Sequence, residues 1–121
     1  MLNTRQQGSH WETEAQRFLQ RRGLKTVQQN FHGRFGEIDL VMLDGPTLVF
    51  VEVRYRSNAR YGSGADSVTF AKQKKIIAAA RRFLQCNRRH RERACRFDVI
   101  SMGDKNGEIE VNWIRSAFDA G

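Results

Sequence analysis

Two stretches of this chain, residues 35–43 and 47–56, alternate apolar and polar side chains in the pattern of β-strands. Between them the sequence reads Asp-Gly-Pro-Thr, a turn signal, so the two stretches predict a β-hairpin. One face of this hairpin is expected to be wholly apolar. Its residues are Ile38, Leu40, Met42, Val49, Val51 and Val53. A hairpin of this kind must bury that face against a core.

The opposite face of the hairpin gathers charge at one end. If the turn is centred on Gly45 and Pro46, Asp39 lies opposite Glu52, and Glu37 lies opposite Arg54. Directly opposed side chains have Cβ atoms roughly 4.5–5.5 Å apart, and like charges so placed are destabilising. A divalent cation removes that cost, and carboxylate oxygens are the ligands that Mg²⁺ and Mn²⁺ prefer.

A solvated face, with Arg54 and Arg56 balancing the acids, is the alternative to a metal site. The same face also carries apolar residues that something must cover. They are Val41, Leu43, Leu48 and Phe50. Carboxylates at the end of a covered sheet face favour the metal site.

Size and charge narrow the class of protein. A chain of 121 residues predicts a single domain, 1–121. The net charge of +8 indicates a polyanionic partner, nucleic acid first and an anionic membrane surface second. No apolar run is long enough for a membrane span, and no signal peptide is visible. Two isolated cysteines, Cys86 and Cys95, are typical of reduced thiols, so we expect a cytoplasmic protein.

The remaining elements follow from apolar periodicity. Residues 9–22 predict an amphipathic helix, with Ser9 and Glu12 as a capping box and Gly23 as its stop. Strands are expected at 24–29, 95–102 and 109–114, a polar loop at 56–64, and a second helix at 69–89. The order α-β-β-β-α-β-β predicts an α/β fold with a mixed sheet flanked by helices.

The second predicted helix is strongly basic and contains no acidic residue. Two heptad-spaced rows lie away from its apolar stripe: Lys74, Arg81 and Arg88, and Lys75, Arg82 and Arg89. The alternative is a solvated face, but such faces normally mix both signs. The rows therefore favour contact with a nucleic-acid backbone, DNA being the first expectation. Lys72 lies on the other flank, near the core edge, where it can reach inward.

Several motifs together resemble a known family. Asp39, followed thirteen residues later by Glu52-Val53-Arg54, resembles the PD-(D/E)xK signature of restriction-endonuclease-like nucleases. Five blocks in order narrow the match: residues 8–19, 36–40, 50–56, Lys72 and 96–100. In this arrangement the chain is similar to the YraN family of small bacterial proteins. Those are predicted endonucleases related to archaeal Holliday junction resolvases.

The resemblance implies roles for matching positions only. Asp39 and Glu52 would bind Mg²⁺ or Mn²⁺, with the Val53 carbonyl as a third ligand and Glu12 as a further acid. Glu12 keeps its other role as the capping-box partner of Ser9. Glu37 would be either an acid behind the metal ligands or a salt-bridge partner of Arg54. Resolvases of the related class act as dimers, which leaves a homodimer open.

One position departs from the nuclease pattern. Arg54 stands where the pattern has lysine, and arginine stays charged, so it can stabilise negative charge but cannot deprotonate water. Lys72 could supply the ammonium instead. We expect either a metal-dependent endonuclease, with Arg56 and Arg60 gripping the backbone, or an inactive nucleic-acid-binding module of the same fold. A third hypothesis is an assembly or adaptor protein whose basic face binds an acidic protein.

Overall fold

The computed structural model describes residues 4–57 and 68–120 of the chain. Its elements follow the predicted order, α-β-β-β-α-β-β, with a short 3₁₀ turn after the second helix. They are α1 (Thr4–Arg21), β1 (Lys25–His32), β2 (Glu37–Asp44), β3 (Thr47–Ser57), α2 (Phe70–Cys86), η3 (Arg88–His90), β4 (Cys95–Lys105) and β5 (Glu108–Phe118). The predicted α/β class is confirmed.

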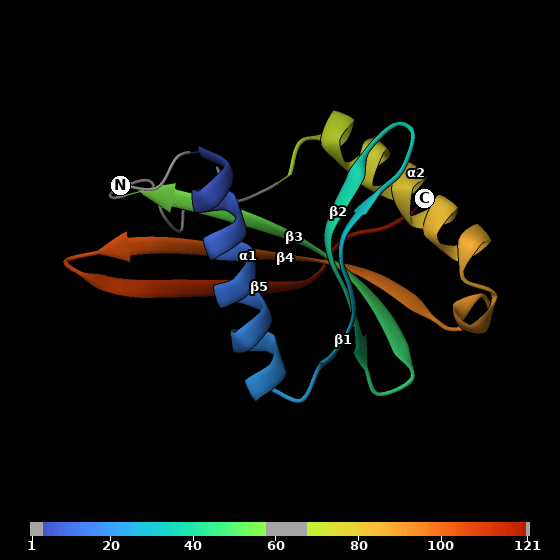
Figure 1. The fold of residues 1–121 in the computed structure, drawn as a ribbon, viewed down its shortest axis with the longest axis horizontal. Coiled ribbons are helices and arrows are strands. Elements are labelled where there is room, and N and C mark those ends of the chain that lie inside the picture. The colour runs from blue at the N-terminus through green and yellow to red at the C-terminus, as the bar shows by residue number, and fades with distance from the viewer. Residues whose placement is uncertain (1–3, 58–67, 121) are drawn as a thin grey trace.

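The five strands form one mixed sheet in the order β1-β2-β3-β4-β5. Neighbours pair antiparallel except β3 and β4, which run parallel. Parallel strands need a crossover, and α2 lies in the connection between β3 and β4. Figure 1 shows α1 crossing one side of the sheet and α2 lying on the other.

The hairpin register is as predicted. Leu40 pairs with Val51, and the ladder closes at Asp44 and Thr47, which leaves Gly45 and Pro46 as a two-residue turn. Gly45 has φ +59°, the left-handed backbone that the first central position of a tight hairpin turn requires. The turn therefore fixes which side chains of β2 and β3 face one another.

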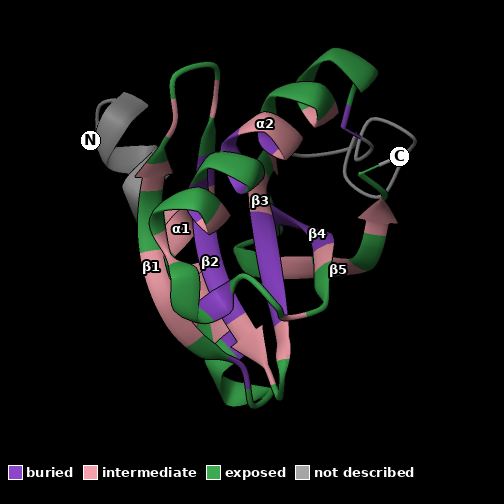
Figure 2. Cartoon of the chain, turned by 90° about the vertical axis from the view of Figure 1, so that its right-hand side faces the viewer, coloured by how far each residue is buried: buried purple, intermediate pink, exposed green. Residues whose placement is uncertain are grey.

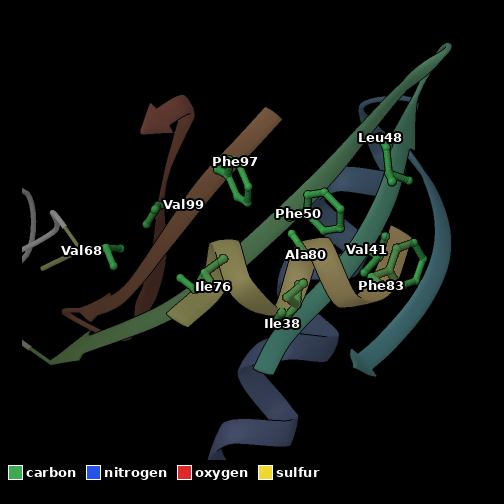
Figure 3. Packing of buried hydrophobic residues seen from close by; sticks show 11 residues of the cluster. Ile38, Val41, Leu48, Phe50, Val68, Ile76, Ala80, Phe83, Phe97 and Val99 are labelled. Atoms are coloured by element: carbon green, nitrogen blue, oxygen red, sulfur yellow. The ribbon is translucent and has the colours of Figure 1, made fainter. Parts of the chain in front are cut away.

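Each face of the sheet buries a separate core under one helix. The first core packs on α1 and includes Ala15, Leu19, Leu40, Val51 and Ile100. The second packs on α2 and includes Val41, Leu48, Phe50, Ile76, Ala80 and Phe83. Figures 2 and 3 show the buried strand segments and the side chains of the second core. The hairpin face that needed a cover is thus covered by α2.

One residue of the predicted apolar face lies on the other side. Ile38 packs in the core under α2, whereas Leu40 packs under α1, so strict alternation fails at the start of β2. The turn before β2 explains the change. Gly36 lies against the backbone of Lys75 in α2, which draws the first residues of β2 toward that helix. The ladder with β3 begins only at Leu40.

The predicted start of α1 is wrong. The helix begins at Thr4, so Ser9 lies inside it and cannot cap its N-terminus. Glu12 is therefore not a capping-box partner. The end is as predicted: the Leu24 N–H bonds the Leu19 carbonyl, the Gly23 N–H bonds that of Gln20, and Gly23 has φ +95°.

The second helix is shorter than predicted. It begins after the N-cap Thr69, whose side chain accepts a hydrogen bond from the Lys72 N–H. It ends at Cys86 because the side-chain amide of Asn87 donates to the Phe83 carbonyl, 2.8 Å away. Arg88 and Arg89 lie in η3 and do not continue the helical rows.

The two C-terminal strands are longer than predicted and meet at a turn where Asn106 and Gly107 have φ +54° and +80°. In the predicted loop, Arg56 instead belongs to β3, and residues 58–64 lie outside the described part of the chain. In residues 4–57 and 68–120 no helix is long and apolar enough to cross a membrane.

A buried carboxylate on β4 links β4 to β5 and, through Arg96, to β2. Asp98 is fully buried and accepts hydrogen bonds from Arg96 Nε (3.1 and 3.2 Å), Trp113 Nε1 (2.9 Å) and the Ser116 N–H (3.0 Å). Arg96 also bonds Asp44 at 2.9 Å. The 96–100 block thus has a structural role in this fold.

Candidate metal and nuclease site

Two acids from the predicted hairpin meet where the β2–β3 ladder ends. The Val53 N–H donates a hydrogen bond of 2.8 Å to Asp39 Oδ2, and the carboxyl groups of Asp39 and Glu52 are hydrogen-bonded to each other. A bond between two carboxyls needs a proton between them. Asp39 and Glu52 therefore lie within reach of one shared cation or one shared proton.

Burial makes Glu52 a poor place for a negative charge. Its side chain is only 12% exposed, and desolvation, followed by the hydrogen bond and charge of Asp39, raises the pKa of Glu52 to about 9. The nearby positive charge of Lys72 lowers this pKa, but by less. At neutral pH the Glu52 carboxyl holds a proton that a cation can displace.

Glu12 brings a third acid from α1. Desolvation, then the charges of Asp39 and Glu37, raise its pKa to about 7, and a hydrogen bond with Asn30 partly offsets the shift. Because the charge of Asp39 acts on both Glu12 and Glu52, the helix and the hairpin contribute to one electrostatic cluster.

Lys72 reaches inward from α2. Its ammonium lies 3.7 Å from Glu52 Oε2. The Thr69 cap starts the helix three residues earlier, and this places Lys72 in the first turn, on the side of α2 next to β3. The prediction that Lys72 can point toward the acids agrees with this geometry.

Glu37 lies at the edge of the cluster. Its carboxylate is 3.2 Å from His32 Nδ1, across the β1–β2 ladder in which these two residues are paired. The predicted Glu37–Arg54 pairing is not part of the ladder, because the β2–β3 pairing starts at Leu40. Glu37 still raises the pKa of Glu12 and Glu52 through its charge.

A pocket of about 360 Å³ opens beside Glu52. It lies between the C-terminal half of β3 and the start of α2, and Arg54 lies in its wall. Its lining residues are Glu52, Val53, Arg54, Tyr55, Arg56, Val68, Thr69 and Lys72. Tyr55 stacks on Trp11 of α1 with ring centroids 4.4 Å apart. The pocket thus combines carboxyl, ammonium and guanidinium groups.

The acids supply the oxygen donors that a hard cation prefers, but they do not form a complete coordination site. Asp39, Glu52 and Glu12 supply carboxylate oxygens, the donors that Mg²⁺ and Mn²⁺ prefer. Among the residues that the structure describes, no group of three His, Cys, Asp or Glu side chains is arranged to hold a metal ion. A bound ion would have to draw these side chains together.

The basic residues divide between two places. Lys74, Lys75, Arg81 and Arg82 are exposed on α2, and Arg88 and Arg89 are exposed on η3. Arg56 lines the pocket instead, and Arg60 lies outside the described residues. The surface rows and the pocket are therefore separate features, joined at the first turn of α2.

Sequence reasoning missed three neighbours of the acids. Asn30 bonds Glu12 from a left-handed position in β1 (φ +50°), and His32 pairs with Glu37. Tyr55 lies in the pocket wall. An asparagine within a strand-like run was a usable signal for Asn30. The glycines of residues 33–36 predict a turn between β1 and β2, and the Gly33 N–H donates to the Gly36 carbonyl at 2.8 Å, beside the His32–Glu37 pair.

The chain is similar to a set of bacterial proteins along nearly its whole length. Residues 11–102 match the model of the uncharacterised protein family UPF0102. A UPF0102 protein of Pseudomonas syringae pv. syringae is 49% identical over 98% of both chains. One from Nitrosococcus oceani is 46% identical over 94% of this chain and 92% of its own. The chain belongs to the UPF0102 family. Because UPF0102 carries no assigned activity in its description, the function has to be argued from the site.

Proposed function

We propose that this chain is a metal-dependent nuclease with a restriction-endonuclease-like fold, acting on nucleic-acid phosphodiesters. One observation carries the proposal: the hydrogen-bonded acids Asp39 and Glu52 face the Lys72 ammonium beside a pocket. The resemblance of residues 39–54 to the PD-(D/E)xK signature supports the same reading. The net charge of +8 suits a polyanionic substrate.

Asp39 and Glu52, with Glu12 as a third acid, would hold Mg²⁺ or Mn²⁺. The ion would supply Lewis-acid activation of a water molecule and of the scissile phosphate. Glu52 would give up its proton when it holds the ion, and Lys72 and Arg54 would stabilise negative charge on the phosphate. Glu12, with a pKa near 7, can hold or release a proton at neutral pH.

A second function has its own supporting observation. Arg54 occupies the position where the nuclease pattern has lysine, and a guanidinium cannot act as a base. This favours a nucleic-acid-binding module that keeps the fold without the chemistry. Lys72 argues for the enzyme, because it brings an ammonium to Glu52 from another element.

A cleavage assay separates the two functions. Duplex, single-stranded and four-way-junction DNA and the matching RNAs are incubated with Mg²⁺, with Mn²⁺ and with EDTA. The enzyme predicts cleavage that requires the divalent ion, retained or increased in Arg54→Lys. Binding without cleavage in both wild type and Arg54→Lys, across all substrates and both ions, would establish the binding module instead.

A further inference from the structure

Two phenylalanines close in sequence to residues of the acidic cluster are largely exposed. Phe35, in the turn before β2, is 68% exposed, and Phe70, the first residue of α2, is 70% exposed. Each has a cation over its ring: Arg34 lies 5.2 Å from the Phe35 centroid, and Lys74 lies 4.6 Å from that of Phe70. Each ring thus presents an exposed aromatic side chain with a cation beside it.

The two rings flank one surface. An α-helix turns by about 100° per residue. Going around the axis of α2 from Phe70, the next side chains are therefore Lys74, then Ala78, then Lys75. The turn that carries Phe35 packs on the Lys75 side, where a Cβ on Gly36 would lie 3.0 Å from Lys75 Cβ. Figure 1 shows this turn beside the first half of α2. Two exposed lysines thus lie between two exposed aromatic rings.

We propose that this surface, made by Arg34, Phe35, Phe70, Lys74 and Lys75, binds unpaired nucleotides of a nucleic-acid substrate. The rings stack on bases, and the cations bind the phosphates between them. Phenylalanine offers a face without a hydrogen-bonding group, and every unpaired base has a complementary π-face. In a duplex those faces are covered by neighbouring bases, so the rings gain little there.

Charge selects nucleic acid over a protein partner. The surface has three cations, and α2 contains no acidic residue to balance them. A docking site for an apolar peptide gains nothing from such an excess, whereas a phosphate chain neutralises it. The surface also leads to the acids: Lys72, two residues after Phe70, contacts Glu52, and Glu37 follows Phe35 by two residues.

This inference rests on the proposed function for its substrate, and it narrows that substrate to nucleic acid with unpaired bases. Binding is measured in EDTA with a fluorescent single-stranded oligonucleotide and with the fully paired duplex of the same sequence. Phe35→Ala and Phe70→Ala are each expected to weaken single-strand binding about tenfold. Duplex binding is expected to change by less than about twofold, because paired bases offer these rings no face to stack on. The Tyr variants keep a ring and retain affinity.

Salt dependence separates stacking from charge. The Ala variants leave the slope of log affinity against log salt unchanged, whereas Lys74→Gln with Lys75→Gln flattens it by about 0.7 per lost phosphate contact. Ile109→Ala, which removes an exposed apolar side chain (50% exposed) from β5, is the control and binds like wild type.

Two results would overturn the inference. If the double Phe→Ala variant binds single strands as tightly as wild type, the surface does not bind nucleotides, and a protein partner becomes the better explanation for it. If the variant loses the same affinity for single strand and duplex, the rings do not stack on unpaired bases. These outcomes are independent of cleavage. A chain that prefers single strands through Phe35 and Phe70 yet cleaves nothing contradicts only the nuclease. Unchanged cleavage of single-stranded substrate in the double variant contradicts only the present inference.

Discussion

The Lys72 ammonium lies 3.7 Å from the Glu52 carboxyl, and this contact joins α2 to the acidic end of the β2–β3 hairpin. In the nuclease pattern, the lysine stands two residues after the acid, where this chain has Arg54. Here the ammonium comes from Lys72, in the first turn of α2. The Thr69 cap fixes where that helix begins. The cation that faces Glu52 thus comes from a residue distant in sequence, which the fold brings to the acid.

Replacing that lysine tests its role. Lys72→Gln is expected to lower metal-dependent cleavage about 100-fold, the usual cost of losing one group that stabilises transition-state charge. Nucleic-acid binding in EDTA is expected to change by less than about twofold, because Lys72 is committed to Glu52. Lys25→Gln, an exposed lysine on β1, is the matched control. Full cleavage by Lys72→Gln would remove Lys72 from the mechanism.

Stability should fall as pH rises through neutrality. The ordinary pKa of Glu52 is 4.5 and its folded value is about 9, so between these values the folded state keeps a proton that the unfolded state has released. The free energy of unfolding then decreases with pH, by at most about 1.4 kcal/mol per pH unit for one group. Glu12, with a folded pKa of about 7, adds the same trend up to about pH 7.

Urea unfolding in EDTA from pH 5 to pH 8.5 measures this. Glu52→Gln should unfold at higher urea than wild type at the alkaline end, and the difference should shrink toward pH 5. A wild type that gains stability relative to Glu52→Gln as pH rises would mean that Glu52 is ionised and stabilised in the folded chain.

The acids should respond to a divalent ion as one site. In wild type, Mn²⁺ is expected to raise the thermal unfolding midpoint at pH 8. Asp39→Asn and Glu52→Gln should each abolish that rise, because each removes a charged ligand. Without metal, their midpoints should equal or exceed that of wild type, since carboxylate repulsion is relieved. Lower midpoints that Mn²⁺ leaves unchanged would instead indicate a structural role for the two acids.

The Asp98 network should be purely structural. Asp98→Asn removes the charge from the fully buried acceptor of Arg96, Trp113 and the Ser116 N–H, and leaves Asp44 as the carboxylate beside Arg96. It is expected to cost about 3 kcal/mol of unfolding free energy. Equilibrium urea unfolding measures the loss, with exposed Asp119→Asn as the control. A loss below about 1 kcal/mol would show that the network is not needed for stability. Residual folded protein should keep its affinity for nucleic acid.

The sequence predicted most where a local signal fixes geometry. The Gly45-Pro46 turn set the hairpin register up to the Leu40–Val51 pair, and Asp39 and Glu52 come directly beyond that pair. Prediction from the sequence failed where tertiary contacts determine which face a residue lies on or where a helix ends. Ile38 changes face because the Gly36 turn packs on α2. Ser9 and Glu12 matched a capping box five residues inside the true start of α1, and the Asn87 bond that ends α2 was not anticipated.

Phosphodiester cleavage by the purified chain tests the central claim most directly. Wild type is compared with the double variant Asp39→Asn/Glu52→Gln, purified in parallel so that a contaminating nuclease appears equally in both. The proposal predicts that wild type cleaves at least one of the single-stranded, duplex or branched substrates with Mg²⁺ or Mn²⁺, that EDTA stops it, and that the double variant binds but does not cleave. Equal cleavage by both preparations, or none by wild type on any substrate with either ion, would contradict it.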